Sequence, residues 1–204
     1  MVELYLRGGV FMWPILALLI LGLAISLERL WTLSRASVKT RKFLAQVREA
    51  LRTGGVKSAL ELCEKTRGPV AAIFHAGLLR ADRGIDQVEK AIVNAGSIEM
   101  AFLERGLVWL ATVVSVAPML GFLGTVWGMV IAFDSIAKAN DISPTIVADG
   151  ISQALLTTVF GLIVAIIMQA AHNFFVSRID RLVIDMEESS VDFIDTLVEM
   201  EKSK

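Results

Sequence analysis

Four of the polar side chains within two long apolar runs of this sequence have chemistry that suits an ion pathway. They are Thr125, Gln153, Thr157 and Thr158. Polar groups in an apolar medium need hydrogen-bond partners or water. One interpretation is that these side chains line a water-containing pathway between helices. The other is that each threonine donates to the carbonyl four residues earlier in its own helix, with the glutamine near the membrane surface.

The composition excludes several classes of protein. The chain has 204 residues, 20 Lys and Arg, 21 Asp and Glu, a net charge of −1 and 55% hydrophobic residues. Soluble domains have about 45–50% apolar residues, so neither a disordered chain nor an ordinary soluble domain fits. The near-zero charge excludes nucleic-acid binding driven by bulk positive charge. One cysteine, two histidines and apolar runs without a Ser/His or paired-Asp set predict no metal site, no cofactor and no enzyme activity.

Three runs without Asp, Glu, Lys or Arg predict three transmembrane helices. They cover residues 8–27, 106–133 and 150–177, and each reaches the length of about 20 residues that crosses a bilayer. The first run is longer than the apolar core of a signal peptide and has no small-residue cleavage site, so we expect it to be retained. Trp13 and Trp31 bracket it about 27 Å apart, as two interfacial anchors would.

Basic residues set the expected orientation. Only Arg7 and Lys138 lie on one side of the membrane, whereas seven basic residues follow the first and third runs: Arg29, Arg35, Lys39, Arg41, Lys42, Arg178 and Arg181. The positive-inside rule therefore places the N-terminus outside and the C-terminus in the cytoplasm. We expect Glu28 and Arg29 to be further interfacial anchors.

The expected division of the chain follows from these spans. It comprises an outer N-terminus with the first helix (1–33), a cytoplasmic segment (34–105), the second helix (106–133), an outer link (134–149), the third helix (150–177) and a cytoplasmic tail (178–204). Helical spacing of apolar residues from Ile85 predicts one helix that continues into the second span. The tail carries an apolar stripe between charged faces, and turns are predicted at 53–55, 66–69 and 82–84. The expected fold class is an all-α integral membrane protein with three transmembrane helices, two of them extended into a cytoplasmic helical bundle.

Small residues in the second and third runs predict close helix packing or contact with a partner. Glycines at 121, 124 and 128 clear one side of a helix for another backbone, and Pro118 leaves a carbonyl without its helical donor, which an assembly must satisfy. The residues expected to pack in this way are Pro118, Gly121, Gly124, Gly128, Ala154, Gly161 and Ala165.

The segments APMLGFLGTVWGM at 117–129 and DGISQALLTTVFGLIVAI at 149–166 resemble the MotA/TolQ/ExbB family of ion-channel subunits. The sequence Glu28-Arg29-Leu30 and the GPVA stretch at 68–71 support the TolQ/ExbB branch, and the resemblance covers nearly the whole chain. MotA-like stators have a fourth span, whereas this sequence has room for three.

The resemblance implies a homopentameric ring in the bacterial inner membrane around two copies of a single-span partner of the ExbD/TolR/MotB kind. The partner's membrane Asp carries the ion, the family's pore threonines match Thr125 and Thr158, and alternating protonation of that Asp would drive work in the outer envelope. A TonB/TolA-like envelope-spanning protein is a further implied partner. The chemistry is sound because a lone Asp in an apolar lumen has a raised pKa and hydroxyls can pass a proton.

Departures from the family pattern leave alternatives open. Gln153 stands where many members have Glu, and Thr157 adds a second hydroxyl, so a sodium-driven motor remains an alternative to a proton-driven one. A non-conducting membrane scaffold is the other. His172 is either a proton relay or an interfacial residue, and Asp134, Asp141 and Asp149 either attract cations or solvate the outer link. The driven process can be TonB-type uptake, Tol-type envelope maintenance, gliding or secretion.

Overall fold

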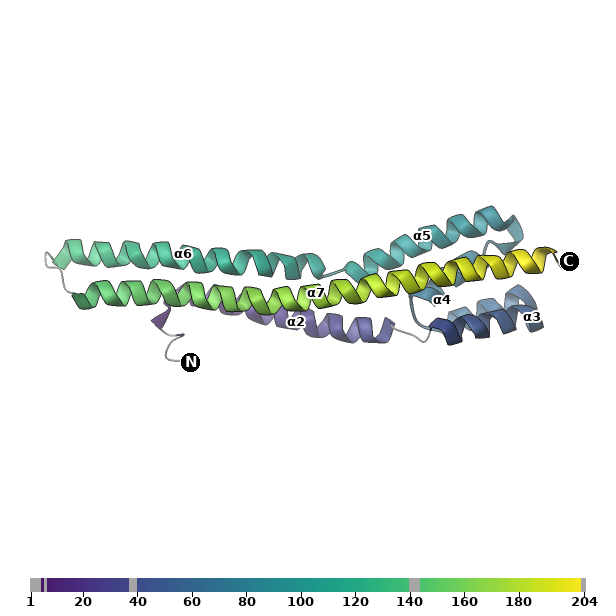
Figure 1. Ribbon diagram of the computed structural model, residues 1–204, viewed down its shortest axis with the longest axis horizontal. Helices are drawn as coiled ribbons and strands as arrows, with labels where there is room; N and C mark the ends of the chain where they lie inside the picture. Colours follow the sequence, from purple (N-terminus) through teal and green to yellow (C-terminus); the bar gives the residue numbers. More distant parts are fainter. Residues whose placement is uncertain (1–4, 6, 37–39, 140–143, 203–204) are drawn as a thin grey trace. The chain divides into compact units, whose positions relative to one another are not determined.

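The computed structural model describes residues 5, 7–36, 40–139 and 144–202, and these ranges contain helices and turns but no strand (Figure 1). The elements are α2 (Met12–Ala36), α3 (Thr40–Lys65), α4 (Pro69–Leu78), the short 3-10 helix η1 (Ala81–Arg83), α5 (Ile85–Glu104), α6 (Leu107–Ala139) and α7 (Pro144–Lys202). The all-α class is thereby confirmed. Lys39 and Asp141 lie outside the described residues.

Three helical stretches are long and apolar enough to cross a membrane. They are Met12–Ser34, Ile85–Lys138 and Val147–Met200. The last two have 54 residues each, far more than the about 20 residues of one crossing. The charge-free runs 106–133 and 150–177 lie inside these two stretches, so each helical stretch extends well beyond the part that the bilayer can hold.

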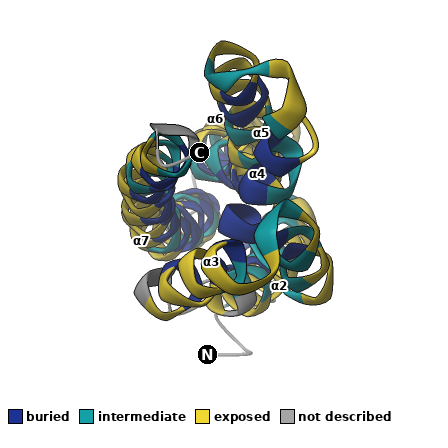
Figure 2. Ribbon diagram, turned by 90° about the vertical axis from the view of Figure 1, so that its right-hand side faces the viewer, coloured by how far each residue is buried: buried dark blue, intermediate teal, exposed yellow. Residues whose placement is uncertain are grey.

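The chain divides into two compact units, each described by itself. We call Met1–Glu28 with Gly106–Phe174 the membrane unit, and Arg29–Arg105 with Phe175–Lys204 the bundle unit. The helix α7, with 59 residues, supplies its first part to the membrane unit and its second part to the bundle unit. Its buried residues gather along one side and its exposed residues along the other (Figure 2).

In the membrane unit, α2 packs against α7 through a glycine. A side chain on Gly22 would overlap the sulfur of Met168, and that methionine is fully buried. At the start of the chain, Tyr5 meets Phe160 of α7 edge to face at a ring separation of 6.2 Å. This edge-to-face geometry is favourable for aromatic pairs, so the residue before α2 and the helix α2 itself both contact α7.

In the bundle unit, three aromatic rings form the centre of the core. Phe74 of α4 stacks on Phe193 of α7 with ring centroids 4.3 Å apart, and on Phe43 of α3 at 6.0 Å. All three rings are buried. Because aromatic side chains bury the largest apolar areas, this stack joins the tail of the chain to α3 and α4.

The prediction of one continuous helix from Ile85 into the second span is wrong, because the helix is interrupted at Arg105 and Gly106. Arg105 leaves the helical conformation (φ −54°, ψ 130°) and Gly106 has φ +90°, so α5 ends before α6 begins. Glycine tolerates this backbone conformation because it has no Cβ. The predicted turns at 66–69 and 82–84 are confirmed as the breaks that flank α4 and η1, and that at 53–55 as a kink at Gly55 within α3.

The end of α5 is capped by a residue far away in the sequence. Arg29 is 5% exposed, and its Nη1 donates a hydrogen bond to the Leu103 carbonyl oxygen at 3.4 Å. Carbonyls in the last turn of a helix lack helical donors, and a cation there also interacts favourably with the helix dipole. The buried position of Arg29 therefore differs from the headgroup-facing anchor expected from the sequence.

The single thiol gives a test of the core of the bundle unit. Cys63 is buried, and burial raises its pKa from 9.0 to about 11. At pH 8 the thiolate fraction should then be about 100-fold lower than in the unfolded chain, since the thiolate is the nucleophile. We expect alkylation of the folded protein by iodoacetamide to be slower by at least that factor, and its rate to rise about tenfold per pH unit up to the raised pKa. Equal rates in native and denatured protein would contradict the buried position.

Candidate functional site

The helices α6 and α7 touch backbone to backbone along a seam of small residues. A Cβ on Gly161 would lie 2.6 Å from the Ala117 carbonyl oxygen, one on Gly121 3.1 Å from the Thr157 carbonyl oxygen, and one on Gly128 3.2 Å from the Gly150 carbonyl oxygen. The contact at Gly161 leaves no room for a side chain, and those at Gly121 and Gly128 are tighter than most contacts of a real Cβ. As the residue number rises along α6, the number of the contacting residue on α7 falls, so the two helices run antiparallel.

We call this contact the glycine seam. It consists of Ala117, Gly121, Gly124, Gly128 and Ala132 on α6 and of Gly150, Ala154, Thr157, Thr158 and Gly161 on α7. Most of the residues expected to pack therefore lie against each other within one chain. Ala165 is buried further along α7, and Pro118 is half-buried next to the seam residue Ala117.

Three hydroxyl groups lie at one level of this seam. Thr158 Oγ1 donates across the helix pair to the Gly121 carbonyl oxygen at 3.1 Å. Thr157, which is 1% exposed, donates to the Ala154 carbonyl oxygen at 2.7 Å and lies against Gly124. Thr125 follows Gly124 in the chain, so the three hydroxyls fall within about one turn of α6.

Two of the three hydroxyls bond their own helix and one bonds the other helix. Thr125 Oγ1 donates to the Phe122 carbonyl oxygen at 2.6 Å, three residues earlier, as Thr157 does on α7. A hydroxyl has one proton to donate and two lone pairs that accept. Because all three protons are engaged with carbonyls, the half-buried Thr125 and Thr158 can offer only oxygen acceptors to a cation, a water molecule or a protonated acid, whereas Thr157 is buried in the helix contact. None of the three hydroxyls stores a proton.

Gln153 lies one turn from Thr157 but takes part in a different contact. Its half-buried side chain packs against Gly9, which has φ +72°, in the segment before α2. Thr157 and Thr158 instead lie at the contact with α6, where Thr125 follows Gly124. The structure thus groups the threonines of the expected pathway and places the glutamine amide against the start of the chain.

The remaining expected residues are placed as follows. Trp13 and Trp31 are 64% and 61% exposed, as side chains that anchor a helix at an interface would be, and Glu28 is exposed as well. Asp134 forms an ion pair with Lys138 at 2.6 Å on the same helix, which fits a solvated link.

His172 has a feature that the sequence did not reveal. Its ring is half-buried, and its Nδ1 is buried without a hydrogen-bond partner among the residues that the structure describes. His172 belongs to the part of α7 in the membrane unit.

Two contacts of this protein could not be predicted from the sequence. The acceptor of the Thr158 hydroxyl lies 37 residues away, and nothing local in the sequence points to it. The α7 side of the seam was partly visible, because Gly150, Ala154 and Gly161 recur at helical spacing and match the spacing of the glycines in α6. Arg29 was assigned to the membrane surface on its position alone.

Comparison with known proteins places this arrangement in a family. A family model described as the MotA/TolQ/ExbB proton channel family matches residues 65–188, which include the whole glycine seam and all three threonines. The chain belongs to this family. With its three apolar helices it is a multi-pass inner-membrane protein, and the relatives below assign it to the TolQ/ExbB branch of the family.

Three relatives show the extent of the similarity. A putative biopolymer transport protein ExbB homolog of Methanothermobacter thermautotrophicus is 36% identical over 179 residues, which is 87% of this chain and 63% of that protein. The putative biopolymer transport protein ExbB-like 1 of Synechocystis sp. is 30% identical, covering 93% and 72%. The Tol-Pal system protein TolQ of Pseudomonas aeruginosa is 38% identical, covering 56% and 54%. The chain thus spans less than two thirds of the first and third of these relatives.

The glycine seam predicts the effect of adding one methyl group. Gly161→Ala should destabilise the protein by about 1–3 kcal/mol, because the new Cβ meets a backbone carbonyl that cannot move aside. The matched control is Gly96→Ala in α5, where a Cβ would lie 3.9 Å from the nearest atom, Ile73 Cδ1; there the helical preference for alanine should stabilise by up to about 1 kcal/mol. Thermal unfolding of both variants in detergent measures the difference. Equal stability of the two would contradict the backbone contact.

Proposed function

We propose that this chain is a stator-like ion-channel subunit of an inner-membrane motor complex that uses the proton motive force. The observation that supports this most is the hydroxyl cluster of Thr125, Thr157 and Thr158, set in a seam of small residues between two charge-free helical runs. Such oxygens relay or solvate an ion but hold no charge of their own. The chain acts as a channel subunit and not as an enzyme.

The titrating group of the pathway comes from another chain in this proposal. The runs 106–133 and 150–177 contain no Asp or Glu, so a carboxyl that loads and releases protons has to be supplied from outside. A single-span ExbD/TolR-type partner with a membrane Asp fits this requirement. In an apolar lumen that Asp has a raised pKa, and its protonated form donates to a threonine oxygen whose own proton is engaged with a carbonyl.

The assembly in this proposal is a homopentamer around a dimer of the partner. Large apolar side chains on the outer side of α6 remain uncovered in the single chain: Met119 is 67%, Phe122 68% and Trp127 49% exposed. Lipid and neighbouring subunits are the apolar surroundings that such a surface needs. Loading and release of the partner's Asp in turn rotates one component inside the other, and a TonB/TolA-like protein transmits this motion to the outer envelope.

The proposed topology follows the distribution of basic residues. The N-terminus and the link 134–149 lie in the periplasm, and the bundle unit lies in the cytoplasm, since Arg and Lys concentrate after the first and third spans. Loading of the ion then takes place from the link side, and release takes place on the side of the bundle unit.

A sodium-driven version of the same motor is the second candidate. It is favoured by the same cluster, because three neutral oxygens without an acid are ligands that a hard cation accepts. A non-conducting scaffold would leave the hydroxyls without a role in transport, and the following variants separate these possibilities.

Removal of one hydroxyl should reduce transport without loss of assembly. Thr158→Val keeps the shape of the side chain and removes the donor to the Gly121 carbonyl, and we expect ion flux through the complex with its partner to fall by at least about tenfold, the size of one lost hydrogen bond of about 1.4 kcal/mol. Thr158→Ser is the matched control, since it retains the hydroxyl and should keep most of the flux. Reconstituted vesicles with a pH gradient or a sodium gradient identify the ion. Wild-type flux in the valine variant would contradict a role of this hydroxyl in the pathway, and absence of flux in the wild-type complex would support the scaffold.

Native mass spectrometry tests the assembly itself. We expect a mass near five times 22.2 kDa for the detergent-extracted protein, with the gain of two small chains when the single-span partner is co-expressed. A monomer or dimer that does not respond to the partner would contradict the stator-like ring.

A further inference from the structure

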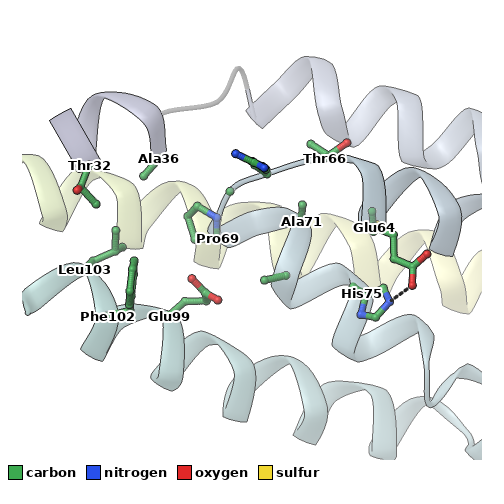
Figure 3. Close-up of a pocket in the computed structure, with 14 residues that line it drawn as sticks. Thr32, Ala36, Glu64, Thr66, Pro69, Ala71, His75, Glu99, Phe102 and Leu103 are labelled. Atoms are coloured by element: carbon green, nitrogen blue, oxygen red, sulfur yellow. Dashed lines mark ion pairs between the residues drawn. The ribbon is translucent and has the colours of Figure 1, made fainter.

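A cavity of about 520 Å³ lies within the bundle unit. It is lined by the ends of α2, α3 and α5 and by the start of α4 (Figure 3). Apolar walls come from Ala36, Pro69, Phe102 and Leu103. Its volume falls in the range of about 300–1,000 Å³ that is typical of small-ligand pockets. The ion pathway proposed above lies in the membrane unit and makes no use of this cavity.

Two charged side chains of opposite sign line the cavity without a partner. Neither Glu99 nor Arg67 has a hydrogen bond or an ion pair with any residue in the described part of the chain. Figure 3 shows Glu99 reaching from α5 towards Pro69, beside Phe102. A second carboxylate, Glu64, is engaged with His75, 3.9 Å from its Nε2. Burial raises the pKa of the Glu99 carboxyl, which indicates that the protein alone does not compensate this charge.

These charges restrict the ligand that fits. A simple cation would meet the guanidinium of Arg67, and a simple anion would meet the carboxylate of Glu99. A neutral molecule would leave the Glu99 carboxylate without a partner, which is unfavourable because this side chain is half-buried. A zwitterion with an anionic and a primary ammonium group satisfies both, because charge-assisted hydrogen bonds are the strong ones. The apolar walls suit the carbon atoms that join the two groups.

Two lining residues of the cavity lie close to charge-free runs in the sequence. Thr32 follows the exposed Trp31 near the end of the first apolar helical stretch, and Leu103 precedes the second charge-free run by three residues. Tryptophan is enriched at membrane interfaces, so this placement favours a ligand found at the level of lipid headgroups.

We propose that this cavity binds a phosphate–ammonium zwitterion, the headgroup chemistry of phosphatidylethanolamine, with the ammonium facing Glu99 and the phosphate facing Arg67. The ligand is either the headgroup of a membrane lipid or free phosphoethanolamine. The site is separate from the proposed ion pathway, so a negative result for lipid binding would not contradict the proposed function, and the reverse is also true.

Lipid competition tests this proposal on the full-length protein. The detergent-extracted protein is incubated with equal amounts of phosphatidylethanolamine, phosphatidylglycerol and phosphatidylcholine of the same acyl chains, and retained lipid is measured by native mass spectrometry. Phosphatidylethanolamine should be retained at least about tenfold over the glycerol lipid, which has no ammonium, as expected for one charge-assisted hydrogen bond. The choline lipid should also bind less, because its methyl groups remove the N–H donors. Equal retention of the three lipids would overturn the proposal.

Variants show whether the named residues are responsible. Glu99→Gln and Arg67→Gln should each reduce the preference to within about twofold, because each removes one charged partner. Glu104→Gln is the matched control, since Glu104 is exposed on the same helix and does not line the cavity; it should leave the preference unchanged. If Glu99→Gln fails to fold, Arg67→Gln decides the question, because Arg67 is exposed between α3 and α4. An unchanged preference in Arg67→Gln or in a folded Glu99→Gln would overturn the assignment.

Soluble phosphoethanolamine separates the two sources of the ligand. Displacement of the retained lipid by millimolar phosphoethanolamine would support a site that takes the free zwitterion as well. Retention of the lipid in its presence, with the preference intact, would support a headgroup site strengthened by acyl chains.

Discussion

The close approach of α6 and α7 is the constraint on which the rest of this structure depends. Where a glycine Cβ would lie 2.6 Å from a carbonyl oxygen of the other helix, the two backbones are in direct contact, and lipid offers no hydrophobic force that would replace such packing. The contact also brings the Thr158 hydroxyl within 3.1 Å of the Gly121 carbonyl oxygen. A side chain at Gly121 would separate the helices and remove this bond, so packing and the placement of the polar cluster are one feature.

In the proposed function, the chemistry of the three hydroxyls accounts for the need for a second protein. Threonine oxygens accept hydrogen bonds and solvate cations, but they do not titrate at any physiological pH. In the proposed mechanism the carboxyl of a single-span partner changes its charge, and this chain supplies fixed oxygens beside its path. Keeping the charged group on the partner and neutral oxygens on this chain is favourable in a membrane, because a permanent charge in the seam would cost several kcal/mol. The seam can then remain tightly packed while the partner's group cycles between its two charge states.

Much of this architecture could be predicted from the sequence. The absence of charge over 106–133 and 150–177 fixed two spans, and the glycines at 121, 124 and 128 indicated a close helix contact, which the structure places within one chain. The partner of Arg29 and the helix end at Gly106 could not be predicted from the local sequence. The guanidinium bonds a carbonyl 74 residues away, and the glycine ends a helix at a point where the local pattern favours its continuation.

The sequence by itself determined the helices, the three membrane crossings and the family, because these depend on composition and spacing along the chain. In a bilayer, an apolar run of sufficient length predicts a helix strongly, since only a helix satisfies its backbone hydrogen bonds within one segment. Only the tertiary structure decided which carbonyl receives the Thr158 hydroxyl, that Gln153 packs on Gly9, and that Glu99 and Arg67 share a cavity. These contacts join residues that are far apart in the chain. Helical periodicity predicts on which face of its helix a residue lies, but it does not predict which other segment packs against that face.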